Sequence, residues 1–248
     1  LSRELAPQNL HCSWNSDKDI LMHQDGKWVL FNIETRLDRP YRPVWKEEKV
    51  YKKGRSLYYQ SGNGLVLTIG GSRDENITYG QYVSRNEFGI EDGVFWSPDS
   101  TRVAFYKKDE SKVASFPLLD ITTRTGSLKE IKYPMAGMDS EMIQIGVYNL
   151  TRCSGTYLKI NDFGEDQYLT NVSWTPDGTK ILVQVLDRSQ KHMHLNMYDA
   201  NTGHFIKTIL TEDNDKFVEP QDPVWFIKGS DILFIYRTDN RHGYKNLY

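Results

Sequence analysis

The stretch Trp96-Ser97-Pro98-Asp99 occurs a second time along the chain, as Trp174-Thr175-Pro176-Asp177. In each copy we expect a tryptophan to end one strand and a Pro-Asp turn to lead into an alternating strand, within residues 100–106 and 178–184. Proline presets φ and aspartate accepts hydrogen bonds from the backbone that follows it, so the pair favours a turn. Weaker copies lie at Trp14-Asn15-Ser16-Asp17 and at Pro223-Val224-Trp225-Phe226.

This repeat predicts the architecture. A unit of four short antiparallel strands every ~40–50 residues is typical of a β-propeller blade, whose apolar faces become buried when blades stack around an axis. A strand pair at 57–60 and 65–68, joined across Gly62-Asn63-Gly64, fits the pattern. We expect the tryptophans to fill the space between blades. The prediction is an all-β chain, a β-propeller of four-stranded antiparallel blades with about five blades or part-blades of a larger ring. A large β-sandwich is the alternative that the repeat disfavours.

The composition excludes several classes of function. The 248 residues include 31 basic and 33 acidic side chains, and a net charge of −2 gives no global attraction to nucleic acid. No apolar run reaches the ~18 residues of a membrane span, and no signal peptide is visible. We expect isolated buried thiols at Cys12 and Cys153, with a disulfide as the alternative. Because the chain lacks an initiating methionine and stops inside an apparent strand, we expect it to be part of a longer polypeptide.

One segment breaks the alternation of the strands. Residues 79–93, directly before the Trp96 repeat, place charged side chains among aromatic residues and glycines. We expect a loop or short helix inserted in a blade. Functional residues concentrate in such insertions, because a rigid scaffold positions them while the loop itself can vary.

Other candidate chemistry fails on pattern. Gly70-Gly71-Ser72-Arg73-Asp74 lacks the closing glycine and the helix of a nucleophile elbow, so a hairpin turn is expected. His192 and His194 would share one face of a strand, but no third metal ligand lies nearby, and surface histidines are the better interpretation. Glu91 and Asp92 would point to opposite sides of an extended chain and are interpreted as loop charges. We predict no metal and no cofactor.

Several stretches resemble the N-terminal propeller of the dipeptidyl peptidase IV family of serine peptidases. They are Asn86-Glu87-Phe88-Gly89-Ile90, Phe95-Trp96-Ser97-Pro98-Asp99, Tyr133-Pro134-Met135-Ala136-Gly137, Tyr168-Leu169-Thr170-Asn171-Val172-Ser173-Trp174, Val218-Glu219-Pro220 and residues 241–248. The resemblance is specific from about residue 70 to the end and rests on pattern before that. Within the family, the bacterial prolyl tripeptidyl peptidase type is the most similar.

The resemblance implies what the whole protein does. Residues 1–248 would be a fragment of the N-terminal propeller, and an α/β-hydrolase domain with a Ser-Asp-His triad, absent from this chain, would follow it. The parent enzyme would release di- or tripeptides after proline from a peptide's amino terminus, in the periplasm or outside the cell. This chain would hold no catalytic residue; it would gate the cavity and bind the substrate, and a homodimer is implied as well.

The resemblance also points to the residues of a binding site. Classical dipeptidyl enzymes carry a Glu-Glu pair on the inserted loop that binds the substrate's amino group, and the matching positions here are Asn86 and Glu87. A carboxylate facing an ammonium in a partly enclosed cavity makes a strong charge-assisted hydrogen bond. We therefore expect Glu87 to bind the substrate's amino terminus, beside Asn86 and with Arg85 contacting substrate carbonyls. The alternative is that Glu87 is an exposed loop acid or the ion-pair partner of Arg85.

A function from another class remains open at this point. Many propellers stand alone and bind a protein or peptide, and the repeat pattern would support such a module equally well. A Gly-x-Ser-x-Gly elbow further along the open reading frame would favour the peptidase.

Overall fold

The computed structural model describes residues 12–14, 18–24, 27–40, 48–61, 65–227, 233–234, 236–239 and 244–247. The chain divides into two compact units, one made of Leu1–Glu48 with Ser61–Leu65 and the other of Lys49–Gln60 with Val66–Tyr248. Each unit is described by itself.

The first unit contains one antiparallel sheet of four strands in sequential order. Its strands are β1 (Cys12–Trp14), β2 (Asp19–Gln24), β3 (Lys27–Asn32) and β4 (Asp38–Pro40). The Asn32 side chain accepts hydrogen bonds from the backbone N–H groups of Glu34 and Thr35, which closes the turn after β3. The sheet follows the predicted blade pattern, and β1 ends at Trp14 as the repeat predicts.

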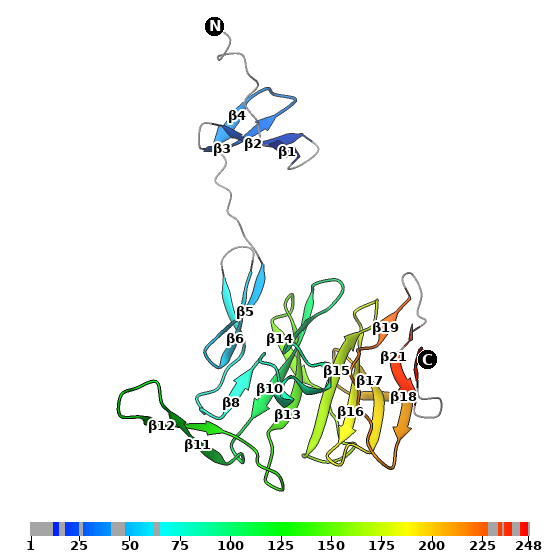
Figure 1. Ribbon diagram of the computed structural model, residues 1–248. Coiled ribbons are helices and arrows are strands. Elements are labelled where there is room, and N and C mark those ends of the chain that lie inside the picture. The colour runs from blue at the N-terminus through cyan, green and yellow to red at the C-terminus, as the bar shows by residue number, and fades with distance from the viewer. Residues whose placement is uncertain are drawn as a thin grey trace. The chain divides into compact units, whose positions relative to one another are not determined.

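The second unit contains three larger antiparallel sheets, ordered β5-β6-β7, then β14-β13-β10-β8 with β9 also paired to β10, then β15-β16-β17-β18 (Figure 1). The strands of the first two sheets are β5 (Lys49–Lys53), β6 (Ser56–Gln60), β7 (Val66–Gly70), β8 (Ile77–Tyr79), β9 (Val94–Trp96), β10 (Arg102–Asp109), β13 (Met142–Asn149) and β14 (Ser154–Tyr157). The strands of the third are β15 (Gln167–Trp174), β16 (Lys180–Asp187), β17 (His192–Asp199) and β18 (Phe205–Asp213). Two short pairs follow, β19 (Trp225–Phe226) with β20 (Leu233–Phe234) and β21 (Tyr236–Asp239) with β22 (Tyr244–Leu247).

Each of these sheets packs face to face on the next through a shared apolar core. Leu57 on β6 meets Tyr79 and Phe105 of the second sheet. Ala104 and Ile145 of the second sheet belong to one buried cluster with residues of β15 and β16. A further cluster joins the third sheet to Val224. These three sheets have three, five and four strands. Serial stacking of such small antiparallel sheets is the packing of propeller blades, which confirms the predicted fold class over the two-layered sandwich.

Two buried polar side chains also cross from the second sheet to the third. The Tyr106 hydroxyl donates a hydrogen bond of 2.8 Å to the Leu169 carbonyl, and burial raises the pKa of this hydroxyl far above its usual range. The Trp174 indole N–H donates at 3.0 Å to the carbonyl of Phe95. Because a buried N–H or O–H without a partner costs about 1–3 kcal/mol, these bonds fix how the two sheets align.

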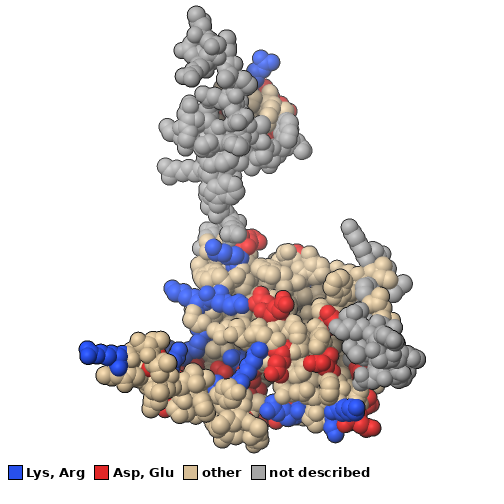
Figure 2. Space-filling view, in the orientation of Figure 1, with Lys and Arg blue, Asp and Glu red and all other residues tan. Residues whose placement is uncertain are grey.

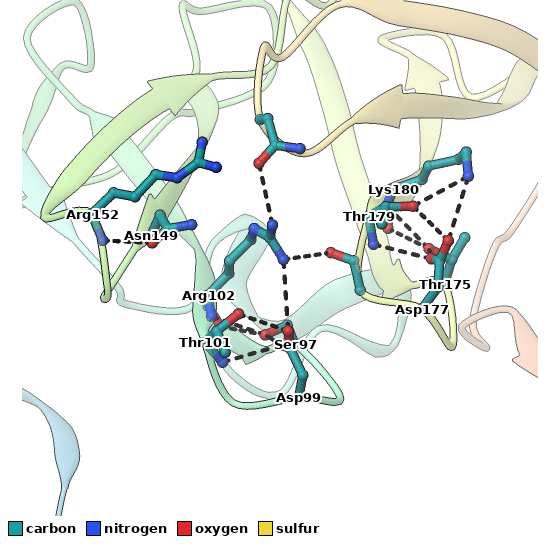
Figure 3. A network of polar contacts seen from close by, with 12 residues as sticks. Ser97, Asp99, Thr101, Arg102, Asn149, Arg152, Thr175, Asp177, Thr179 and Lys180 are labelled. Carbon is teal, nitrogen blue, oxygen red and sulfur yellow. Dashed lines mark hydrogen bonds and ion pairs between the residues drawn. The ribbon is translucent and has the colours of Figure 1, made fainter.

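The two Pro-Asp turns have the same internal hydrogen bonds (Figure 3). The Asp99 carboxylate accepts from the Ser97 hydroxyl at 2.6 Å and from both the backbone N–H and the hydroxyl of Thr101. Asp177 accepts from the Thr175 hydroxyl at 2.5 Å and from the corresponding groups of Thr179. These bonds favour the charged carboxylate, so the hydroxyl of Ser97 and then Thr101 lower the pKa of Asp99 to about 2.

One residue links the first turn to the next sheet. The Arg102 guanidinium, 16% exposed, donates to the Gly178 carbonyl at 3.2 Å and to the Asn201 side-chain oxygen at 3.3 Å (Figure 3). The residue at the same place in the second copy, Lys180, forms an ion pair of 3.7 Å within its own turn, with Asp177. The two copies therefore share the hydrogen bonds within their turns. The link to the next sheet is made by Arg102 of the first copy.

The structure corrects two expectations. Trp174 is buried between sheets as predicted, at 9% exposure, but Trp96 is 38% exposed and Trp225 is 60% exposed, so these two are not buried. Cys153 is a free thiol and is exposed rather than buried, in the turn between β13 and β14. Nothing is described for the side chain of Cys12.

The sequence did not predict an arm between β10 and β13. Strands β11 (Ser115–Asp120) and β12 (Ser127–Lys132) pair only with each other among the described residues and form a hairpin that projects from the second sheet (Figure 1). Figure 2 shows basic and acidic side chains intermingled over the described part of one face. Within the described part of the chain, no helix has the length and apolar character needed to span a membrane.

Replacing Arg102 with alanine should destabilise the protein by about 2 kcal/mol, because two acceptors on the neighbouring sheet lose a charged donor. Lys180→Ala is the matched control, since Lys180 occupies the same place in the second turn but reaches no other sheet; it should cost no more than about 0.5 kcal/mol. Urea unfolding followed by circular dichroism measures both values. Equal costs would mean that the Arg102 link does not hold the sheets together.

The turn aspartates should make the stability depend on acid pH. A carboxyl whose folded-state pKa lies below its ordinary 3.8 adds stability above that value, and this contribution is lost as the pH falls toward about 2. The Asp99→Asn, Asp177→Asn double variant should be less stable at pH 7 and should lose less stability than the wild type between pH 5 and pH 2. Urea unfolding across this range tests the prediction, which parallel curves for the two proteins would contradict.

Candidate functional site

The inserted segment interrupts the inner edge of the second sheet. Strands β8 and β9 both pair with β10, at Lys107–Asp109 and at Val103–Phe105, and residues 80–93 leave the sheet between them. Tyr106 closes this gap: its N–H donates to the Gly93 carbonyl at 3.0 Å and its carbonyl accepts from the Gly80 N–H at 2.8 Å. The predicted insertion is confirmed, and its two ends are held together by one residue of β10.

The insertion contains a short 3-10 segment, η1 (Ser84–Gly89), with an unusual backbone. Ser84, Arg85, Asn86 and Phe88 have φ between 50° and 64°, in the left-handed region. Such a conformation costs about 1–2 kcal/mol for a residue with a side chain, although asparagine tolerates it better than most. Glu87 differs, with φ −68° and ψ 166°. Backbone strain of this kind persists only where surrounding contacts over-determine it, and it clusters at functional sites.

The far end of η1 is anchored in the third sheet. The Phe88 ring is buried, 7% exposed, and its centroid lies 4.9 Å from that of Tyr168. The Phe88 carbonyl accepts a hydrogen bond of 3.2 Å from the buried Asn171 side chain, which lies at a register shift of β15. At Gly89, φ is +71° and an added Cβ would lie 2.0 Å from the Gln221 carbonyl oxygen, so only glycine fits.

A cavity of about 160 Å³ lies beside η1. Its charged and aromatic lining comes from three parts of the chain: Arg85 and Glu87 on η1, Glu141 next to β13, and Tyr168 and Arg188 from the third sheet and the turn after β16. A larger cavity of about 440 Å³ shares Ile143 and Gln167 with it and has Lys107, Asp109 and Glu165 at its margin.

The structure separates the three residues that the sequence singled out. All three side chains are exposed; Glu87 and Arg85 line the cavity, and Asn86 is not part of the lining. Glu87 is thus an exposed loop acid, as the alternative expected, that also lines the cavity. The Arg85 guanidinium lies over the Tyr133 ring, 3.7 Å from its centroid. Within the described part of the chain no ion pair joins Arg85 to Glu87, so the alternative of a structural pair between them is not observed. Asp92, interpreted as a loop charge, pairs with Lys52 at 2.7 Å.

Sequence reasoning missed three residues of the lining. Arg188 donates a hydrogen bond of 2.5 Å to the Tyr168 hydroxyl and lies 3.8 Å from an oxygen of Asp166. Burial raises the pKa of Tyr168, against the opposing effect of the Arg188 charge. Tyr168 lay in a stretch that matches the family pattern, but neither Arg188 nor Glu141 lies near the inserted loop in sequence, and no local signal identifies them.

The arrangement is suited to binding rather than to bond cleavage. The cavity offers carboxylates for a cation and guanidinium groups for carbonyl or carboxylate oxygens. The two candidate imidazoles belong elsewhere, because His192 pairs with Asp213 at 2.6 Å and His194 with Asp162 at 2.7 Å. No group of three or more His, Cys, Asp or Glu side chains among the described residues could hold a metal ion.

Comparison with known proteins connects this geometry to a family. A family model described as the N-terminal region of dipeptidyl peptidase IV matches residues 40–248. A dipeptidyl-aminopeptidase B from Aspergillus niger is 24% identical over 268 residues, which cover 91% of this chain and 30% of that protein.

Solved structures agree in fold. A protein from Bacteroides ovatus, described as a dipeptidyl aminopeptidase IV, superposes with a TM-score of 0.73 at 32% identity, covering 94% of this chain and 34% of its own. Dipeptidyl peptidase 4 of Porphyromonas gingivalis gives a TM-score of 0.71 at 16% identity over 96% of this chain and 35% of its own, a likeness of fold alone. The chain thus spans about a third of the length of these relatives.

Gly89→Ala should destabilise the protein by more than the ~1–2 kcal/mol that a left-handed alanine costs, because the new methyl group would also displace the Gln221 backbone. Gly137→Ala is the matched control: Gly137 has φ +77° and nothing within 4 Å of an added Cβ. Thermal unfolding of both variants measures the difference. A Gly89→Ala protein as stable as the control would show that η1 and residue 221 are not tightly packed.

Proposed function

Since the chain belongs to the family of dipeptidyl peptidase IV N-terminal regions, we propose that it is the propeller part of a serine exopeptidase and that the cavity beside η1 binds the amino terminus of the peptide substrate. Catalysis would take place in an α/β-hydrolase domain of the same polypeptide, and the propeller would gate access to it. The similarity to peptidases favours this function over a propeller that only binds a partner.

The observation that carries the proposal is the position of Glu87. Glu87 lies between strained residues, departs from their left-handed conformation, and contributes its side chain to the wall of the cavity. The pKa of the Tyr168 hydroxyl, whose residue lines the same cavity, is raised mainly by burial, and the Glu87 charge adds a small further rise. A protein does not hold so costly a backbone without compensation, and presenting a carboxylate at a fixed place supplies a functional reason for it.

An exopeptidase needs this geometry for a simple reason. It must place the scissile bond a fixed number of residues from the free amino group, so it needs an anion at a fixed distance from its nucleophile. A carboxylate fixed beside a cavity meets that need, because a charge-assisted hydrogen bond to ammonium is roughly twice as strong as a neutral one. Internal peptide segments lack the charge and would be rejected.

The other charged groups would orient the bound peptide. The Arg188 guanidinium is held by Tyr168 and Asp166, and Arg85 by the Tyr133 ring, so both are pre-positioned to meet substrate carbonyl oxygens. Asn86 in place of a second glutamate leaves one carboxylate on the loop and room for a longer amino-terminal segment. The enzyme would therefore release tripeptides as well as dipeptides. We further propose that it is periplasmic or secreted and forms a homodimer.

The test is Glu87→Gln in the full-length enzyme, with a peptide substrate whose amino terminus is free. Losing a hydrogen bond between charged groups should lower kcat/KM by about 10- to 100-fold. Glu91→Gln is the control, because Glu91 is exposed on the same insertion and does not line the cavity; it should leave kcat/KM unchanged. Equal kinetics for Glu87→Gln and the wild-type enzyme would remove Glu87 from the binding site.

A further inference from the structure

We infer that Glu141 is a positioning residue that holds the near end of η1 and thereby fixes where Glu87 lies in the cavity wall. Its effect on peptide cleavage rests on the proposed function, whereas its effect on the loop does not.

Glu141 reaches η1 from a distant part of the chain. It directly precedes β13, and its side chain is 16% exposed. One carboxylate oxygen, Oε1, accepts a hydrogen bond of 2.5 Å from the backbone N–H of Ser84, the first residue of η1. The other, Oε2, lies 3.8 Å from the Lys108 ammonium, which in turn lies 3.3 Å from Glu110. A carboxylate so placed is held from both sides.

The loop needs a contact of this kind at its near end. The strained residues begin at Ser84, and the anchors formed by Phe88 and Asn171 act only at the far end. Val83 is buried, and the hydrogen bond from the Asn86 N–H to the Val83 carbonyl is local, within a single turn. The bond to Glu141 is the longer-range link that fixes the first strained peptide, and a charged acceptor makes it strong.

A second role for Glu141 must be distinguished from this one. Glu141 also lines the cavity, so the alternative role is that of a second carboxylate that binds the substrate's ammonium directly. Both of its oxygens already have a donor as partner, however: the Ser84 N–H on one and the Lys108 ammonium near the other. The lysine offsets the negative charge that a substrate cation would need, which favours the positioning role.

Two conservative variants of Glu141 distinguish the effect of side-chain length from the effect of side-chain charge. Glu141→Gln keeps an oxygen at the same distance, so it can still accept from Ser84 but has no charge. Glu141→Asp keeps the charge on a side chain one methylene shorter, so it should not reach the Ser84 N–H. Glu165→Ala is the control, because Glu165 is an exposed carboxylate paired with a lysine and does not line this cavity.

The readouts are tryptic cleavage after Arg85 in the native full-length enzyme and kcat/KM on a peptide with a free amino terminus. For Glu141→Asp we expect cleavage after Arg85 to be at least about 5-fold faster and kcat/KM about 5- to 10-fold lower, since a freed loop no longer holds Glu87 in place. Glu165→Ala should resemble the wild-type enzyme in both measurements. Glu141→Gln, whose uncharged oxygen still accepts from Ser84, should change both measurements in the same direction as Glu141→Asp but by less.

The outcomes are distinct. Unchanged cleavage after Arg85 in Glu141→Asp would overturn the inference. A loss of kcat/KM in Glu141→Gln without faster cleavage would also overturn it, because the charge rather than the reach would then matter. Faster cleavage in Glu141→Asp, together with normal kinetics of Glu87→Gln, would support the positioning of the loop while contradicting the proposed function.

Discussion

Tyr106 makes the connections on which the rest of the structure depends. Its side chain is fully buried between two sheets and bonds the Leu169 carbonyl of the neighbouring blade, while its backbone bonds Gly80 and Gly93 at the two ends of the insertion. One residue therefore fixes both the alignment of the blades and the base of the loop. Since a buried hydroxyl must keep its acceptor, neither sheet can slide without losing this bond.

The strained backbone of η1 is stabilised by contacts with residues that are distant in the sequence. Four residues of η1 with left-handed backbone would not hold this form in an isolated peptide, because the cost of several kcal/mol exceeds what a single turn recovers. Burial of Phe88 and the bonds from Asn171 and to Glu141 offset the cost. The contacts of Phe88 and Asn171 form only after the second and third sheets have packed, and the contact of Glu141 only after β13 has paired with β10.

This division explains what the sequence could predict. The turns at Asp99 and Asp177 are made by residues within five positions of one another, so the repeat is enough to predict them and the strands around them. The insertion could be predicted because it breaks the alternation of the strands. Glu87 could be singled out because its position matches the family pattern. The conformation of η1, the role of Glu141, the exposure of Trp96 and the projecting β11–β12 arm depend on which segments become neighbours in the fold, and no local pattern encodes that.

Asn86 stands where the family resemblance implies a second glutamate, and the backbone there bears on which residue fits. Residue 86 has φ 64° and ψ 15°, a conformation that asparagine adopts more readily than glutamate. Asparagine therefore lowers the strain of the loop at the position where a carboxylate would be exposed and outside the cavity lining. Glu87, by contrast, has an ordinary φ and needs no such tolerance. In this backbone a glutamate at residue 86 would add strain without adding a carboxylate to the cavity lining.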